Sequence, residues 1–562
     1  ARPSPRHGAH LRPGTPRAAA MPPQQTSVAD NNGVGLRRSR SSTDSLSNHP
    51  TDESKEVAYT YSRSRLLSLI NWLEVGKSYL PQMLKLLVAV LVMQIAHGLY
   101  EHRFDLSAML AKARETPSVA VVGELRPFLL QLGVETTLLG ILAVWWLIRR
   151  ERPVFLLDFA TFEAPEEWKV SHEQLISIMR NLGCYTPDSV EFMERILSKS
   201  GTGQATAWPP GIIRCLKGLP QDTSVEASRH EATTVMFDVV RKVLRRTGVK
   251  PKEIDFLIVN CSLFSPTPSL CTMVCNEFKL RPTCRTYNLS GMGCSAGIIS
   301  IDLAAQLMNT HPNSTALVVS TEVITDCLYH GNERSMLLQN TLFRCGGAAM
   351  ILSNKWRDAT RAQMKLLHTV RMQMITEESV SCVYEQQDSL GNSGVALSKE
   401  IVKVAGRAME QNLTRLGPKV LPVSEQAKVV ASIAYRHIAK ALKPYIGLPK
   451  MKPYIPDFKR AVDHFCIHAG GRGVIDGIEK NLNLMPRHTE PSRHTLYHYG
   501  NTSSSSIWYE MDYVRRQMDL RRGQRVLQLA FGSGFKCTSA VWLSLRSARS
   551  ITRDLEASEQ DQ

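Results

Sequence analysis

The chain has 562 residues, of which 43% are hydrophobic and 21% charged, a composition typical of a folded protein with more than one ordinary core. Its formal net charge of +17 suits an anionic partner, such as a phosphorylated cofactor or an acidic membrane surface. In the part expected to fold, no lysine and arginine run is interleaved with aromatic residues, so we expect no nucleic-acid partner.

The N-terminal region 1–60 is rich in Pro, Ser, Arg, Asn and Asp and has few aliphatic side chains. Such a segment cannot bury enough apolar surface to fold, so we expect a disordered tail. Met21 offers a plausible start, and residues 1–20 are then an extension without a structural role.

Two apolar segments follow, at about 83–100 and 127–148, within a region that we interpret as a membrane anchor over 61–151. Each approaches the roughly 20 residues that a bilayer crossing requires. Lys and Arg flank the outer ends of the pair, which favours a hairpin with both ends in the cytosol. Glu135 is costly in hydrocarbon, so a pair of buried core helices or a re-entrant hairpin stays open as an alternative.

From Arg152 onward, short β-rich runs alternate with longer helical patterns, which predicts an α/β fold with buried sheets. The predicted strands are 256–260, 316–320, 348–352, 464–468 and 526–530, and the predicted helices are 229–246, 424–443, 471–483 and 507–520. The twelve cysteines form no CxxC pair, and we interpret them as free thiols in a reducing compartment.

Cys294 stands on a turn that reads GMGCSAG over 291–297, between a strand end at 283–287 and a helical pattern at 298–308. A helix N-terminus behind a thiol favours the thiolate, and glycine is used where a backbone must approach a ligand. We therefore predict an outward-facing nucleophile; the alternative is a buried structural cysteine.

Three further polar turns come later in the chain. His464 and His468 lie four apart, hence on one face of a strand, but no third ligand accompanies them and no metal site is expected. Asn501 follows a glycine on a polar loop before a helical pattern, where a helix cap is the simpler interpretation. The sequence FGSGF at 531–535 is a glycine turn after a strand, able to present backbone N–H groups.

Together these motifs resemble those of the plant-type 3-ketoacyl-CoA synthases, the membrane-bound condensing enzymes of very-long-chain fatty acid elongation in the thiolase-fold superfamily. The resemblance covers roughly 60–545. Departures at His498-Tyr499, Gly473 and 372–378 bear on substrate preference more than on reaction type. The matching motifs, in order, are RPVFLLDF at 152–159, GMGCSAG, LFRCGGAA at 342–349, GPKVLPVSEQ at 417–426, HFCIHAGGR at 464–472, GNTS at 500–503 and FGSGF.

The resemblance implies a thiolase-like five-layer αβαβα core of two similar halves, preceded by the two-helix membrane hairpin. The N-terminal half with the nucleophilic cysteine would span 152–360. The C-terminal half with the catalytic His and Asn would span 361–546, and 547–562 would be a disordered tail.

The resemblance also implies residue roles, with Cys294 as the acyl-accepting nucleophile. Family positions supply the rest: His468, Asn501, His464 and His368 in the catalytic set; Cys294, Ser533 and Gly534 in the oxyanion hole; Gly532 and Tyr497 at the substrate.

The implied reaction is a decarboxylating Claisen condensation of malonyl-CoA with a long-chain acyl-CoA through an acyl-cysteine, which gives a 3-oxoacyl-CoA two carbons longer. Neither a metal nor another cofactor is expected, because decarboxylation drives carbon–carbon bond formation. The implied setting is the endoplasmic reticulum membrane, with a multi-pass anchor, a cytosolic catalytic domain, homodimerisation, and elongase reductases and a dehydratase as partners. A type III polyketide synthase-like enzyme and a non-catalytic elongase scaffold stay open as alternatives.

Overall fold

The computed structural model describes residues 88–90, 93, 140, 152–441, 449 and 451–560. The tail expected at 1–60 lies outside the described residues, and so does nearly all of the anchor expected at 61–151, including most of both apolar segments. Among the helices that can be described, none combines the length and apolar character that a bilayer crossing requires.

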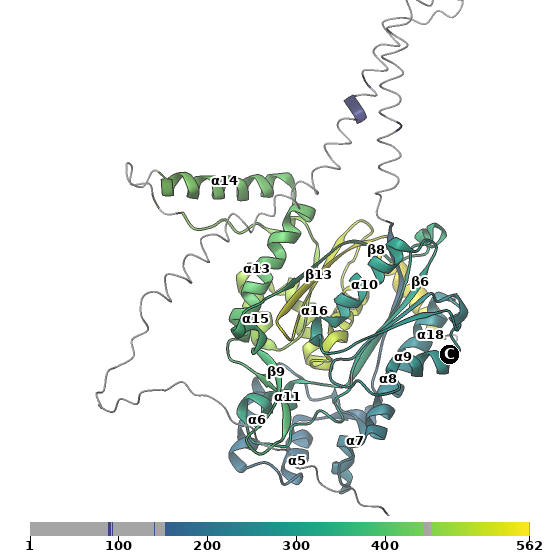
Figure 1. The fold of residues 1–562 in the computed structure, drawn as a ribbon, viewed down its shortest axis with the longest axis vertical. Helices are drawn as coiled ribbons and strands as arrows, with labels where there is room; N and C mark the ends of the chain where they lie inside the picture. The colour runs from purple at the N-terminus through teal and green to yellow at the C-terminus, as the bar shows by residue number, and fades with distance from the viewer. Residues whose placement is uncertain are drawn as a thin grey trace, which may run out of the picture. The chain divides into compact units, whose positions relative to one another are not determined.

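A mixed β-sheet with helices packed around it forms the frame of residues 152–560 (Figure 1). It has nine strands, in the order β11-β12-β13-β8-β1-β7-β6-β4-β5. Five of its strands, β4, β6, β7, β11 and β12, coincide with the predicted strand runs to within a few residues. The strands of the sheet are β1 (Val154–Thr161), β4 (Phe256–Asn260), β5 (Arg285–Leu289), β6 (Thr315–Glu322), β7 (Gly346–Ser353), β8 (Met364–Gln373), β11 (His464–Ile467), β12 (Arg525–Gly532) and β13 (Lys536–Ser544). Two-stranded ribbons pair β2 (Lys169–Val170) with β3 (Thr206–Ala207), and β9 (Val383–Gln387) with β10 (Ser393–Leu397).

The two ends of the sheet repeat one pattern of strand pairing. In the first, β4 is parallel to β6, and β7 is antiparallel to both β6 and β1. In the second, β11 is parallel to β12, and β13 is antiparallel to both β12 and β8. The repeats meet where β1 pairs antiparallel with β8. The carboxyl ends of the parallel strands in each repeat therefore lie at one edge, the usual place for sites in α/β sheets.

Helices cover both outer faces of the sheet and fill the space between its two repeats. The predicted helices are all present, with ends shifted by a few residues. They are α5 (His172–Asn181), α6 (Pro187–Lys199), α7 (Pro210–Ile213), α8 (Val225–Thr247), α9 (Leu270–Phe278), α10 (Ala296–Thr310), α11 (Arg334–Leu342), α12 (Glu377–Val380), α13 (Ile401–Val420), α14 (Val423–Ala441), α15 (Arg472–Asn481), α16 (Pro486–Tyr499), α17 (Ser506–Gln517) and α18 (Ala548–Gln560).

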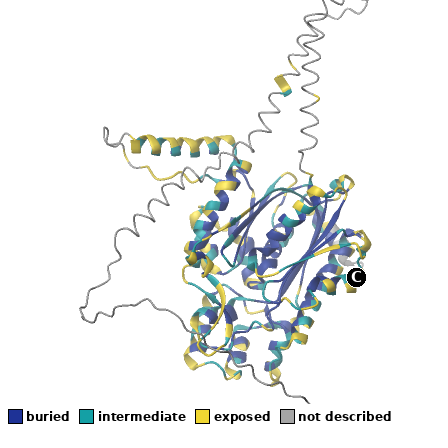
Figure 2. Ribbon diagram, in the orientation of Figure 1, coloured by how far each residue is buried: buried dark blue, intermediate teal, exposed yellow. Residues whose placement is uncertain are grey.

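Alternation along the strands sends side chains to different hydrophobic clusters. In β4, Leu257 and Val259 face the outer cluster with α8, whereas Phe256 and Ile258 face a central cluster. That central cluster holds α10 and α17 together with strands from both repeats, and the third cluster packs α13 and α15 against β11, β12 and β13. Figure 2 shows the strands as the most continuously buried part of the fold. Burial on both faces explains why the strands read as continuous apolar runs.

The C-terminal segment corrects one expectation. Residues 547–562 were expected to be disordered, but 548–560 form α18. Ile551 and Leu555, four residues apart, are buried, which gives the short helix an apolar face.

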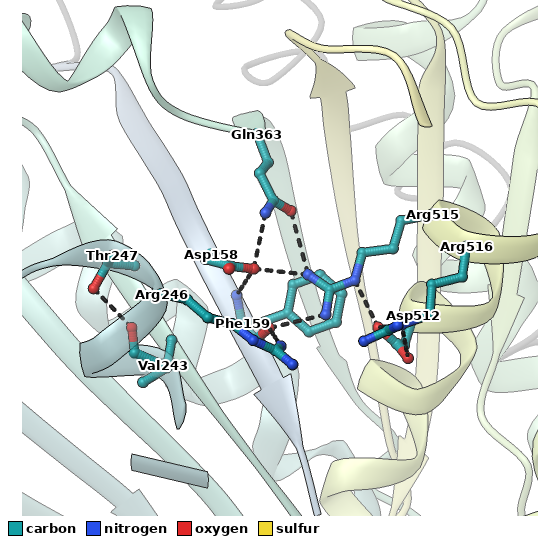
Figure 3. A network of polar contacts seen from close by, with 9 residues as sticks. All are labelled: Asp158, Phe159, Val243, Arg246, Thr247, Gln363, Asp512, Arg515 and Arg516. Atoms are coloured by element: carbon teal, nitrogen blue, oxygen red, sulfur yellow. Dashed lines mark hydrogen bonds and ion pairs between the residues drawn. The ribbon is translucent and has the colours of Figure 1, made fainter. Parts of the chain in front are cut away.

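A buried ionic network joins the two repeats (Figure 3). Arg515 of α17 is fully buried; it donates to Asp158 Oδ1 of β1 at 2.7 Å and to Asp512 Oδ1 at 2.6 Å. Its guanidinium lies 3.6 Å from the centroid of the Phe159 ring, and Gln363 also donates to Asp158 Oδ1 at 2.8 Å. The network holds α17 against β1, and with it the polar loop that precedes α17.

Candidate active site

The turn that carries Cys294 leads from β5 into α10, and Cys294 itself lies in the one-turn helix η4 (Gly293–Ser295). Gly293 has φ +63°, a left-handed conformation that favours glycine. A Cβ on Gly293 would lie 2.5 Å from the Ser533 nitrogen, and a Cβ on Gly532 would lie 2.4 Å from Ser295 Oγ. The nucleophile turn and the 532–534 turn are therefore packed backbone to backbone, which brings the Ser533 N–H beside the Cys294 turn.

Cys294 is only partly exposed, and its sulfur contacts Ser503 from the C-terminal half of the chain. Burial raises the pKa of the thiol to about 12; a contact with Ser503 opposes the shift and the charge of Glu322 adds to it. The expectation of a thiolate favoured by the helix N-terminus is thus wrong for the free protein. Desolvation of a charged sulfur outweighs the helix dipole, whose effect is limited to ~2 kcal/mol even in favourable geometry.

The Ser503 hydroxyl contacts the Cys294 sulfur and also the Glu322 carboxylate. Ser503 Oγ lies 3.6 Å from Cys294 Sγ and 2.8 Å from Glu322 Oε2. One hydroxyl proton serves one acceptor at a time, so a protonated thiol can donate to Ser503 while Ser503 donates to Glu322. Both Ser503 and Glu322 are buried, and Ser503 has φ +54°.

Glu322 is the residue that sequence reasoning missed. It ends β6, and its Oε1 accepts from the backbone N–H groups of Ser262 at 2.8 Å and Leu263 at 2.9 Å. Cys261 Sγ also donates to Oε1 at 3.3 Å. Burial raises the pKa of Glu322 despite these donors. A glutamate at the end of a buried strand was the available signal, since such a carboxylate must find partners.

His468 and Asn501 come together around Gly470. His468 directly follows β11 and is 3% exposed, and its Nδ1 has no hydrogen-bond partner among the described residues. Burial lowers the pKa of His468 to about 4, which leaves a neutral imidazole at physiological pH. Asn501 Nδ2 donates to the Gly470 carbonyl at 3.4 Å, while a Cβ on Gly470 would lie 3.3 Å from His468 Nε2.

The backbone around Asn501 is fixed from two sides. Its N–H donates to the Leu342 carbonyl at 3.1 Å, and its carbonyl accepts from the Arg344 N–H at 2.9 Å. Its side-chain Oδ1 accepts from the Ser503 N–H at 2.9 Å, so the loop carries both Asn501 and the hydroxyl at Cys294. Arg344, from the LFRCGGAA motif, is fully buried and donates through Nε to Thr206 Oγ1 at 2.7 Å.

Two of the histidines assigned to the catalytic set lie elsewhere. His464 begins β11, three residues before the strand's end, and its Nε2 contacts Gln524 Oε1 at 3.1 Å. His368 of β8 is partly buried near Lys419 and Arg525; desolvation, reinforced by these two cations, lowers its pKa to about 4. Because a strand advances about 3.3 Å per residue, His464 is roughly 13 Å along the chain from His468. The contacts of both histidines lie at this opposite end of the C-terminal repeat.

The remaining assigned residues occupy two places. Gly534, with φ +66°, closes the turn after Ser533. Tyr497 on α16 is 53% exposed, and its carbonyl accepts from the Gly203 N–H at 2.8 Å. No contact with Cys294 is found for Tyr497 in the described part of the chain.

An apolar cavity adjoins the cluster on the side of the N-terminal repeat. Its internal volume is about 20 Å³, which leaves room for about one water molecule. Leu263, whose N–H binds Glu322, and Phe343, which forms a β-bridge with Asn501, are in its wall. The lining residues are Trp208, Leu263, Ile324, Cys327, Leu328, Gln339, Asn340 and Phe343. Within 152–441 and 451–560, no group of three or more His, Cys, Asp and Glu side chains is placed to hold a metal ion.

Comparison with known families and proteins identifies relatives of this chain. Residues 146–438 match the family described as FAE1/Type III polyketide synthase-like protein, and 459–543 match the 3-oxoacyl-[acyl-carrier-protein] synthase III C-terminal family. The chain is 47% identical over 435 residues to 3-ketoacyl-CoA synthase 5 of Arabidopsis thaliana, covering 77% of this chain and 86% of that protein. It is 49% identical to 3-ketoacyl-CoA synthase 6 of the same plant, over 72% of this chain and 79% of the relative. The probable 3-ketoacyl-CoA synthase 20 of Oryza sativa subsp. japonica is 47% identical, over 76% and 80%.

Solved structures agree on the fold. A fungal type III polyketide synthase, ORAS, aligns with a TM-score of 0.53 at 18% identity, over 70% of this chain and 99% of that one. A type III pentaketide synthase from Neurospora crassa gives the same TM-score, identity and coverage. The fold is thus the α/β thiolase-like fold, and on the evidence of its motifs, its strand order and these relatives the chain belongs to the 3-ketoacyl-CoA synthase family.

Proposed function

We propose that the chain condenses a long-chain acyl-CoA with malonyl-CoA, releases CO2 and CoA, and yields a 3-oxoacyl-CoA two carbons longer. The observation that carries the proposal is the packing of the Cys294 turn against the Ser533 N–H and against Ser503, on the loop that also holds Asn501, whose amide reaches Gly470 beside His468. A nucleophile beside backbone donors, with a neutral imidazole and an amide nearby, fits thioester chemistry.

In the first half-reaction, the Cys294 sulfur attacks the thioester carbonyl of acyl-CoA. Because the raised pKa keeps this sulfur protonated at rest, its proton passes to neutral His468 during the attack. The Cys294 and Ser533 N–H groups stabilise the tetrahedral oxyanion. The carbon–sulfur bond to CoA then breaks, and His468 returns the proton to the CoA sulfur.

In the second half-reaction, malonyl-CoA loses CO2, and the enolate oxygen accepts hydrogen bonds from His468 and from Asn501 Nδ2. The enolate carbon attacks the acyl-cysteine carbonyl, and the carbon–sulfur bond to Cys294 breaks. The Cys294 thiolate takes up one proton from solvent to regenerate the thiol. The Asn501 amide is oriented for this donation, because its Oδ1 is occupied by the Ser503 N–H.

We further propose the finer architecture and setting that the family suggests. Repetition of one strand order and three hydrophobic clusters support a five-layer αβαβα core of two similar halves. The apolar segments 83–100 and 127–148 support a multi-pass anchor in the endoplasmic reticulum membrane, with the catalytic domain cytosolic. Elongase reductases, a dehydratase and a second copy of the chain are the proposed partners.

The test uses the full chain in membranes, supplied with radiolabelled malonyl-CoA and acyl-CoA primers of graded length. Wild type and the control Cys275→Ala should elongate equally. Cys294→Ala should give no elongated product yet retain malonyl-CoA decarboxylation, because the enolate-binding pair is intact. Equal elongation by Cys294→Ala would overturn the mechanism and favour a non-catalytic scaffold. Cyclised products from repeated malonyl additions would favour a type III polyketide synthase-like reaction instead.

A further inference from the structure

Helix α14 is attached to the rest of the fold through one of its faces. Glu425 is buried and accepts from Lys428 Nζ at 2.8 Å, from the Tyr454 hydroxyl at 2.7 Å and from the Asp457 N–H at 3.1 Å. About two turns further along the same face of the helix, Ser432 Oγ accepts from the Tyr454 N–H at 3.1 Å. These contacts fix the orientation of the helix about its own axis.

The opposite face of α14 is apolar and uncovered by any described residue. At 3.6 residues per turn, the stripe lies about 180° around the helix from Glu425 and Ser432. Its valines and isoleucine are 73%, 64% and 54% exposed, and its alanines are exposed as well. Figure 2 shows the helix exposed or partly exposed along most of its length. The members of the stripe are Val423, Ala427, Val430, Ala434 and Ile438.

The returning segment contacts the attached face of the helix through Tyr454, and it exposes further apolar side chains. Met451, Tyr454 and Ile455 are 46%, 36% and 63% exposed. A stripe at helical spacing is the pattern that normally buries a helix against a core, so its exposure here calls for a covering surface.

The charge of residues 426–456 favours an anionic surface as the covering partner. From 426 to 456 the chain contains no Asp or Glu, whereas its basic residues are Lys428, Arg436, Lys440, Lys443, Lys450 and Lys452. A helix with an apolar stripe, a basic remainder and no acidic side chain is typical of segments that lie in the plane of an anionic membrane. A protein partner would be expected to meet some acidic residues for specific pairing.

We propose that the exposed stripe of α14 forms an interfacial membrane-docking surface that recognises anionic lipid. The apolar stripe enters the headgroup boundary, and the basic side chains reach the lipid phosphates and carboxylates. This contact belongs to the catalytic domain itself and is separate from the N-terminal anchor expected at 61–151. It holds the catalytic domain at the lipid surface, where long acyl chains partition.

The test uses the full chain with Val430→p-benzoylphenylalanine, reconstituted in vesicles of phosphatidylcholine with roughly 30% phosphatidylserine. Irradiation followed by mass spectrometry should identify a lipid adduct at position 430. Leu390→p-benzoylphenylalanine is the matched control, because Leu390 is 79% exposed on the β9–β10 turn and should give no adduct. Ile438→p-benzoylphenylalanine repeats the test on the same stripe, in case the first variant folds poorly.

Charge dependence completes the test. Each basic residue near an anionic surface changes affinity by about fivefold, so pure phosphatidylcholine should cut the adduct yield by at least that factor. Arg436→Gln with Lys440→Gln should cut the yield in anionic vesicles similarly. A crosslink from position 430 to another copy of the chain, no lipid adduct at either stripe position, or equal adducts at 390 and 430 would each overturn the proposal. Elongation activity is not needed for any arm, so the result is independent of the proposed catalytic function.

Discussion

Glu322→Gln probes the unexpected contact network behind the nucleophile. The contacts of 3.6 and 2.8 Å through Ser503 place Cys294 Sγ and the Glu322 carboxylate about 6 Å apart at most. Two unit charges at that distance interact by about 3 kcal/mol at an effective dielectric constant of 20. Replacing the charged carboxylate by an amide of the same size should therefore lower the pKa of the thiol by about 2 units.

The assay is the rate of Cys294 alkylation by iodoacetamide, followed by peptide mass spectrometry with Cys275 as the internal reference. In the wild type, a pKa of about 12 predicts a rate that rises about tenfold per pH unit to pH 10 without a plateau. At about pH 9 the variant holds some 100-fold more thiolate, but each thiolate is about tenfold less nucleophilic. The expected net result is about tenfold faster alkylation of Cys294 in Glu322→Gln.

Glu231→Gln is the matched control, because Glu231 is equally buried but binds the backbone of Ile324 and Thr325 rather than Ser503. Its alkylation profile should match the wild type. An unchanged or slower rate in Glu322→Gln would refute the reasoning. A wild-type plateau near neutral pH would show that the thiolate already exists at rest, paired with a cation.

Three further outcomes follow from the packing. Gly293→Ala places a Cβ 2.5 Å from the Ser533 nitrogen and should reduce kcat/KM for elongation by roughly 10²-fold, the typical loss of one oxyanion donor; wild-type kinetics would contradict the shared oxyanion site. Gly473→Ala meets nothing within 4 Å and lies within α15, so thermal inactivation should show stability gained by about 0.5–1 kcal/mol; a loss would indicate an unseen contact. Asp158→Ala leaves Arg515 buried with one carboxylate fewer and should destabilise by about 3 kcal/mol in denaturant unfolding, and no change would mean that the pair is energetically neutral.

The local sequence was sufficient to predict the elements whose formation depends on local interactions. Apolar runs of four to eight residues became buried strands, and the helical pattern after Cys294 became α10, because both patterns reflect burial on defined faces. The glycine turn at 291–297 was readable for the same reason, since Gly293 adopts a left-handed conformation that few other residues accept. The expected disorder at 548–560 was wrong, because Ile551 and Leu555 give α18 a short apolar face that is buried.

Most of the elements, their order, and the motifs that carry Cys294, His468 and Asn501 could be predicted from the amino-acid pattern. The solvation of the Cys294 sulfur could not be predicted, because its burial and the proximity of Glu322 come from segments distant in the chain. In the structure His464 and His468 lie at opposite ends of β11, because four residues of extended strand span roughly 13 Å. Electrostatics and exposure depend on what surrounds a residue in space, and linear spacing alone does not contain that information.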